Sequence, residues 1–179
     1  MEEFADNPFL PNFYKEPKRF AFPMELFLMA ERFKQLQSHI HHRDMFSDYI
    51  VSDYTFVKTL LFAKNNLPEE EYRLFHDMYQ ILSEQIPNPD ILVYLHRPLD
   101  ILKQQIIRRG RPYEQNIESN YLQGLQNMYF EYFRNEVQFP ILMIDLGTVN
   151  FITAPEAYQE IKNLMINEWK PGLHRIGLK

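Results

Sequence analysis

Apolar residues recur along much of this chain at the three- and four-residue spacing of helices. A helix over about 24–37 would place them on one side, and Pro23 suits its first turn, where a missing N–H leaves no bond unmade. That side would consist of Leu26, Met29, Ala30, Phe33 and Leu36. Similar patterns predict helices over about 54–64, 69–84, 98–109, 118–134 and 155–169. Residues 1–23 hold four prolines and are expected to form short helices and turns.

Continuous apolar runs predict the strands. Residues 91–95 and 141–145 each read as a buried strand, and 49–51 as a shorter one. Strands that alternate with helices indicate an α/β fold with a parallel sheet. Three strands are few for such a sheet. We therefore expect one domain over residues 1–170, lacking a first strand, and a loose tail over 171–179.

Composition narrows the possible functions. The chain has 179 residues, a net charge of −5 and no cysteine. The negative charge disfavours a nucleic-acid partner, and the lack of cysteine excludes disulfides and thiolate sites. No apolar run approaches the roughly 20 residues that span a bilayer, and Met1-Glu2-Glu3-Phe4 does not resemble a signal peptide. A cytoplasmic protein without a membrane partner is the expectation.

Glycine is scarce, and this bears on phosphate binding. The first of five glycines is Gly110, and no segment reads GxxxxGK[ST]. A phosphate-binding loop needs glycines so that backbone N–H groups can close on the phosphates. We expect the chain by itself to phosphorylate nothing efficiently.

A group of arginines and one carboxylate could nevertheless act on a ligand. Arg108, Arg109 and Arg111 flank Gly110, and arginine forks bind phosphate oxygens in pairs. They could equally form a solvated helix end. Glu2 could accept a proton from a hydroxyl, or belong to an exposed terminus.

Three further residues could contact a ligand. Glu25 and Arg32 lie seven positions apart on one helix face, which suits either a ligand site or an ion pair. Asp53 follows a predicted strand, where ligands bind in α/β sheets, but it could also cap a helix. The six histidines show no metal-binding spacing.

These segments together resemble the deoxynucleoside kinases. The resemblance rests on residues 2–10, Phe13-Tyr14, 19–22, Glu25 with Arg32, and Arg109-Gly110-Arg111 with Glu114. Ser52-Asp53-Tyr54 with Lys58 and 62–64 is most similar to bacterial deoxyguanosine kinases. The similarity extends to about residue 165. It implies a P-loop-kinase-like fold, a parallel five-stranded sheet flanked by helices, and transfer of the ATP γ-phosphate to the 5′-hydroxyl of a deoxynucleoside.

The resemblance also implies roles for individual residues. Glu2 would be the general base, and Tyr14 and Glu114 would hold the sugar 3′-hydroxyl. Base recognition would fall to Glu25 and Arg32, with Asp53 near the substrate. The phosphates of ATP, with Mg²⁺ as the expected cofactor, would be held by the two residues of a lid, Arg109 and Arg111. The active form would be a homodimer.

The chain departs from the family at several positions. The family's first strand, Gly-rich loop and following helix are absent, and Gln105 replaces a frequent lid arginine. Asp53-Tyr54 stands where many relatives have an acid–arginine pair. Many relatives have glutamine in place of Glu25. An ionised carboxylate only accepts hydrogen bonds, which suits the N1–H and 2-amino donors of guanine, while an arginine pairs with O6 and N7.

These observations favour a deoxynucleoside kinase acting on a purine, with deoxyguanosine preferred. The alternative is a non-catalytic nucleoside-binding or dimerising remnant of such an enzyme.

Overall fold

The computed structural model describes residues 7–41, 46, 48–115, 117–136 and 138–178. The chain divides into two compact units, Met1–Pro87 and Asn88–Lys179. The expectation of one domain over residues 1–170 stays a prediction.

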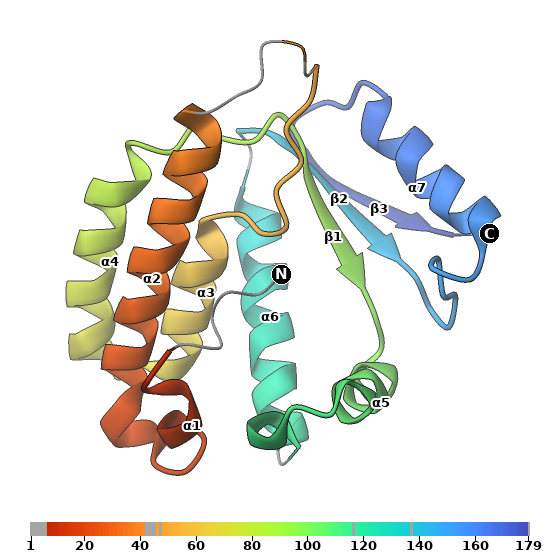
Figure 1. The fold of residues 1–179 in the computed structure, drawn as a ribbon. Helices are drawn as coiled ribbons and strands as arrows, with labels where there is room; N and C mark the ends of the chain where they lie inside the picture. The colour runs from red at the N-terminus through yellow and green to blue at the C-terminus, as the bar shows by residue number, and fades with distance from the viewer. Residues whose placement is uncertain (1–6, 42–45, 47, 116, 137, 179) are drawn as a thin grey trace. The chain divides into compact units, whose positions relative to one another are not determined.

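The first unit is helical (Figure 1). Its elements are α1 (Leu10–Phe13), α2 (Pro17–His41), α3 (Val57–Asn66) and α4 (Glu69–Ser83). The buried side chains of α2 recur every three or four residues, as the pattern of a helix packed on one side requires. They are Ala21, Met24, Glu25, Leu28, Met29, Arg32 and Leu36. Both charged candidates of this helix therefore lie on its buried side.

The second unit is a parallel sheet covered by helices (Figure 1). The strands β1 (Leu92–His96), β2 (Pro140–Asp145) and β3 (Gly172–Gly177) lie in the order β1-β2-β3. The remaining elements are α5 (Leu99–Arg109), the 3₁₀ turn η2 (Pro112–Glu114), α6 (Ser119–Asn135) and α7 (Pro155–Ile166). This arrangement confirms the predicted class, a parallel sheet flanked by helices.

Alternation along β2 distributes its side chains between two cores. Ile141 and Met143 pack against Phe133 of α6 on one face. Leu142 and Ile144 pack against α7 on the other. A strand buried on both faces must be apolar throughout, which is why it was recognisable in the sequence.

Two predictions about strands were wrong. Residues 49–51 form no strand, and the side chains of Tyr49 and Val51 are 75% and 76% exposed. Three apolar residues cannot stabilise a strand without a neighbour to pair with. The tail, expected to be loose, forms β3 over Gly172–Gly177 and pairs in parallel with β2. Its alternation is visible in Leu173 and Ile176, which pack into opposite cores.

The start of α2 also differs from the prediction. The helix begins at Pro17, so Pro17 takes the first-turn position and Pro23 lies inside the helix. Proline cannot donate the hydrogen bond that the helix would form there, yet the helix continues because its buried side is packed. Ala30 was placed on the buried side by the pattern and is exposed.

Candidate functional site

Glu25 is a charged residue buried in the helical packing of the first unit. It has no exposed surface, and its Oε1 accepts a hydrogen bond from Asn66 Nδ2 at 2.6 Å. Oε2 accepts none from the part of the chain that the structure describes. Burial raises the pKa of Glu25 from 4.5 to about 7, against the lowering effects of the Asn66 hydrogen bond and the Arg32 charge. Near neutral pH the carboxyl can therefore be protonated or ionised. The protonated form can donate a hydrogen bond, whereas the ionised form only accepts.

Arg32 is held by side chains from outside its own helix. Its Nη1 donates to Thr59 Oγ1 of α3 at 3.1 Å, and its guanidinium lies 5.7 Å from the ring centroid of Tyr54. The Tyr54 hydroxyl donates in turn to Gln35 Oε1. Arg32 is 4% exposed. A buried cation needs such polar and aromatic neighbours to offset its desolvation.

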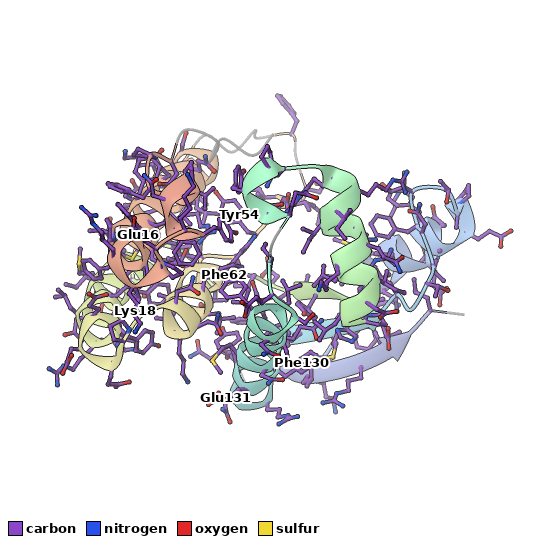
Figure 2. The ribbon with its side chains drawn as sticks, turned by 90° about the horizontal axis from the view of Figure 1, so that it is seen from below. Glu16, Lys18, Tyr54, Phe62, Phe130 and Glu131 are labelled. Carbon is purple, nitrogen blue, oxygen red and sulfur yellow. The ribbon has the colours of Figure 1, made fainter. Side chains whose placement is uncertain are left out.

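The backbone of Tyr54, the aromatic neighbour of Arg32, has an uncommon conformation. Tyr54 has a φ of 144°, which a bulky residue rarely adopts, and Ser52 Oγ donates to its carbonyl oxygen at 2.7 Å. Figure 2 labels Tyr54 and also Phe62, a residue of α3 whose ring centroid lies 5.8 Å from Lys58 Nζ. Asp53, beside Tyr54, is exposed and follows no strand, so the strand-end argument for its role was wrong.

Asn7 fixes the segment that leads into α1. It is 2% exposed, its Oδ1 accepts from the Phe9 N–H at 2.9 Å, and its Nδ2 donates to the Met24 carbonyl at 3.4 Å. The side chain thereby connects this segment to the turn of α2 that carries Glu25. Tyr14, at the end of α1, is half-buried with its ring centroid 5.1 Å from that of Phe13.

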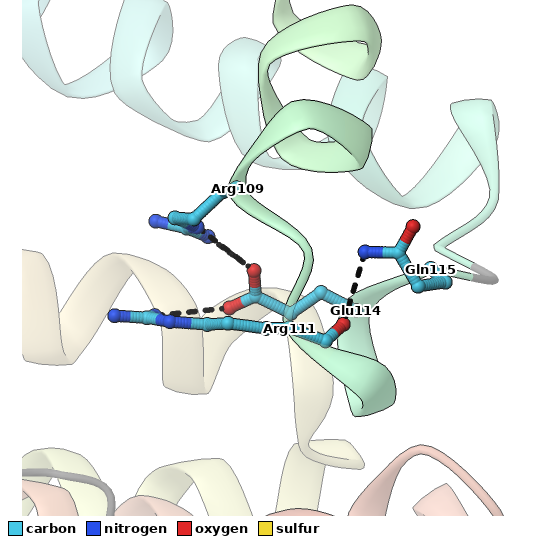
Figure 3. Close-up of polar contacts among 4 residues, drawn as sticks. All are labelled: Arg109, Arg111, Glu114 and Gln115. Carbon is cyan, nitrogen blue, oxygen red and sulfur yellow. Dashed lines mark hydrogen bonds and ion pairs between the residues drawn. The ribbon is translucent and has the colours of Figure 1, made fainter.

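The arginine cluster of the second unit surrounds one carboxylate (Figure 3). Glu114 Oε2 accepts from Arg109 Nε at 3.0 Å and also from its Nη2. Oε1 accepts from Arg111 Nη1 at 3.2 Å, and Gln115 Nε2 donates to the Arg111 carbonyl at 3.0 Å. Gly110 ends α5 in the left-handed conformation, with a φ of 74°, which turns the chain so that both arginines reach Glu114.

The structure therefore brings Arg109, Arg111 and Glu114 together, which the sequence had assigned to two different tasks. Glu114 is buried, while the arginine side chains are 45% and 31% exposed. Tyr14 and Glu114 belong to different units, so their joint action on a sugar hydroxyl stays a prediction. Glu2 lies outside the described residues.

A cavity of about 340 Å³ lies by the carboxyl ends of β1 and β2, where ligands bind in parallel sheets. Its lining includes Tyr94, Arg97, Gln105 and Gln126. Arg97 donates to the carbonyl oxygens of Gly147 and Val149, at 3.3 and 2.7 Å, so it fixes the loop after β2. Burial raises the pKa of Tyr94 to about 12, so this phenol stays neutral.

Sequence reasoning missed two residues that contact the candidates, and it did not predict the contact of a third, Tyr54, with Arg32. Asn66, Thr59 and Tyr54 act on Glu25 or Arg32 from α3 or the segment before it. The predicted helix ended at Lys64 and so excluded Asn66. A buried charged pair on α2 implies polar partners on the neighbouring helix, which is the signal that could have directed attention to α3.

Within the described ranges, no group of three or more histidine, aspartate or glutamate side chains could hold a metal ion. Mg²⁺ often binds through one or two carboxylates together with substrate phosphates, so it stays an expectation of the resemblance. No helix in the part of the chain described is both long and apolar enough to cross a bilayer.

Known proteins are similar to this chain in sequence and fold. Deoxyguanosine kinases are 28% identical in Bacillus subtilis, over 87% of this chain and 77% of the relative, and 30% identical in Lactobacillus johnsonii, over 96% and 85%. A deoxyadenosine kinase of Lactobacillus acidophilus is 28% identical over 87% of this chain and 76% of its own length. The structure of deoxyadenosine kinase from M. mycoides with bound dCTP superposes with a TM-score of 0.74 at 26% identity, covering 92% of this chain and 84% of that one.

The deoxynucleoside kinase family model matches residues 1–169. This range includes the Glu25–Arg32 helix, the arginine cluster and the strands β1 and β2, so the resemblance inferred from separate motifs extends through both units. The chain therefore belongs to the deoxynucleoside kinase family.

Proposed function

We propose that this protein binds a purine deoxynucleoside, deoxyguanosine in preference to deoxyadenosine, as the acceptor of the ATP γ-phosphate. The observation that carries the base preference is the buried Glu25 carboxyl, with Asn66 on one oxygen and Arg32 two helical turns away. Kinases of both purine deoxynucleosides are among the relatives, so the choice between them is argued from this carboxyl.

Hydrogen-bond chemistry supports guanine. The ionised Glu25 accepts from N1–H and the 2-amino group, whereas adenine presents a lone pair at N1. Arg32, positioned by Thr59, pairs with the guanine acceptors O6 and N7. An unpaired buried polar group costs about 1–3 kcal/mol, so the preference for deoxyguanosine should be roughly tenfold to a hundredfold.

Phosphoryl transfer would use the other candidates. Glu2 accepts the proton of the 5′-hydroxyl, and Arg109 and Arg111 stabilise the charge on the transferred phosphoryl group. Tyr14 and Glu114 hold the sugar 3′-hydroxyl, and Asp53 contacts the substrate. The 179 residues contain no GxxxxGK[ST] segment, whose backbone donors and lysine bind the phosphates. Transfer by these residues alone is therefore expected to be negligible.

The buried Glu25 carboxyl also favours a second candidate function, a non-catalytic nucleoside-binding or dimerising protein. Two measurements on the purified 179-residue chain test the nucleoside binding that the kinase and a nucleoside-binding remnant share, and the expected lack of transfer by this chain alone. Calorimetric titration with deoxyguanosine should show binding, and an assay with ATP should show negligible product. Robust phosphorylation would reject the proposed inactivity and the non-catalytic alternative. Absence of purine deoxynucleoside binding would reject the kinase and the nucleoside-binding remnant, and would leave only a dimerising protein.

The active form is proposed to be a homodimer that pairs through the helices over about 24–38 and 54–64. Leu26, Phe33 and Leu60 are only partly buried in the single chain, which leaves apolar surface on α2 and α3 for a second copy. Sedimentation at micromolar concentration should give the mass of a dimer. A monomer would contradict this assembly.

A further inference from the structure

We infer that Asn66 is a positioning residue that selects the purine, because it holds Glu25 as a hydrogen-bond acceptor and makes the choice between guanine and adenine depend on pH. The inference rests on the proposed role of Glu25 in reading the base. It concerns a residue that touches Glu25 and acts on the base through it.

Two consecutive amides form a short relay that ends on Glu25. Asn65 Nδ2 donates to Asn66 Oδ1 at 3.2 Å, and Asn66 Nδ2 donates to Glu25 Oε1 at 2.6 Å. Because Asn65 engages the Asn66 carbonyl oxygen, the NH₂ group of Asn66 is the part that faces the carboxyl. Both residues lie in the last turn of α3, one helix away from Glu25. The relay gives Oε1 a fixed donor and leaves Oε2 for a ligand.

The surroundings of Glu25 explain why one amide matters. Burial favours the protonated carboxyl, while the Asn66 hydrogen bond and the charge of Arg32 favour the ionised one. On α3, Lys64 is exposed and the Lys58 side chain lies over the ring of Phe62. Helix α1, with the sequence LPNF, carries no titratable side chain. On α4, Glu69, Glu70, Arg73 and Asp77 are exposed, and Glu71 and His76 are half-buried. The charge that acts on Glu25 is that of Arg32, and Asn66 supplies its hydrogen bond.

The two forms of Glu25 suit different purines. The ionised form accepts from guanine and repels the lone pair at adenine N1. The protonated form can donate to adenine N1 and accept from the 6-amino group, as a glutamine would. The pKa of Glu25 is about 7, so lower pH should favour deoxyadenosine and higher pH deoxyguanosine. Loss of the Asn66 donor raises the pKa of Glu25. The pH at which the affinity for each purine deoxynucleoside changes should therefore rise as well.

The test begins without a ligand. The side-chain carboxyl carbon of Glu25 is titrated by NMR in the wild type, Asn66→Leu and Asn65→Leu. The matched control is Gln80→Leu, which replaces an exposed amide of α4. We expect the midpoint to rise in Asn66→Leu and to rise less in Asn65→Leu, where the amide keeps its place but loses its orienting partner. The midpoint of Gln80→Leu should equal that of the wild type.

The same four proteins are then titrated with each purine deoxynucleoside from about pH 6 to about pH 8. One-proton linkage predicts that deoxyguanosine affinity falls about tenfold per pH unit below the Glu25 midpoint and is constant above it, with the reverse for deoxyadenosine. In Asn66→Leu both breakpoints should move with the NMR midpoint. Thermal unfolding of each variant shows that the fold persists.

The outcomes distinguish this inference from the proposed function. An unmoved NMR midpoint in Asn66→Leu, or a moved midpoint with unmoved binding curves, overturns the role of Asn66 while deoxyguanosine binding still stands. Failure of the wild type to bind either purine deoxynucleoside at any pH overturns the proposed function, and the purine selection by Asn66 falls with it.

Discussion

Arg109 Nε donates a hydrogen bond to Glu114 Oε2 at 3.0 Å, so the carboxylate assigned to the sugar is already bound by an arginine assigned to the phosphates. Arg111 reaches the other oxygen of the same carboxylate. Binding of phosphates to the arginines and of a sugar hydroxyl to Glu114 therefore involves one shared cluster. A ligand that engages one group must compete with, or rearrange, the contacts of the others.

Arg109 and its neighbour Arg108 provide a matched comparison of this cluster. In a form that phosphorylates deoxyguanosine, Arg109→Ala should lower kcat/KM by about tenfold or more, because a bidentate donor to phosphate oxygens is lost. Arg108 is exposed, and Arg108→Ala should leave kcat/KM within about twofold. Steady-state kinetics with varied ATP measures both. Equal losses in the two variants would show that only the positive charge of the helix end matters.

Glu25 should make the free energy of unfolding depend on pH. Its pKa rises from 4.5 to about 7 on folding, so its contribution to stability is full below about pH 4.5 and is lost as pH rises through about 7. At about 1.4 kcal/mol per pKa unit, the loss is about 3 kcal/mol. Glu25→Gln keeps an acceptor for Asn66 and removes the charge, so its stability relative to the wild type should increase over this range.

Denaturant unfolding at several pH values measures this difference. Glu84→Gln, at the exposed end of α4, is the control and should follow the wild type throughout. If the difference between Glu25→Gln and the wild type does not change with pH, Glu25 is not a buried group that titrates near neutrality.

The role of Glu2 is tested by removing its carboxylate while keeping the shape of its side chain. In a form that turns over, Glu2→Gln should lower kcat by roughly 10²–10⁴, because the 5′-hydroxyl loses the group that accepts its proton. The control is Glu118→Gln, an exposed carboxylate before α6. A Glu2→Gln turnover within about threefold of the wild type would remove Glu2 from the role of general base.

The sequence predicted the elements whose pattern is long or apolar throughout. β2 is buried on both faces, β1 is apolar from Leu92 to Leu95, and α4 and α6 have one apolar side, so their types were visible and their boundaries close. The segment over 49–51 was misread because three apolar residues fit a strand or an exposed loop equally well. β3 was missed because only its pairing with β2 shows why Leu173 and Ile176 alternate.

Candidate residues were easier to identify than their contacts. Glu25 and Arg32 were correctly placed on one helix face by their seven-residue spacing, because spacing determines which helix face a side chain occupies. Asn66 lies 41 positions from Glu25, and only the packing of α3 on α2 brings it within 2.6 Å. Glu114 was separated in function from Arg109, although the turn at Gly110 joins them. Such contacts depend on tertiary packing, which spacing does not contain.

The central claim is that Glu25 reads the base of a purine deoxynucleoside. The most direct test is the pair of dissociation constants for deoxyguanosine and deoxyadenosine, measured by calorimetry above pH 7 on the wild type and Glu25→Gln. Glutamine can rotate its amide to donate to adenine N1 and accept from the 6-amino group. We predict a preference for deoxyguanosine of roughly tenfold to a hundredfold in the wild type and a clearly smaller one in the variant. A ratio that the substitution leaves unchanged would contradict the claim and would make Glu25 a structural partner of Arg32.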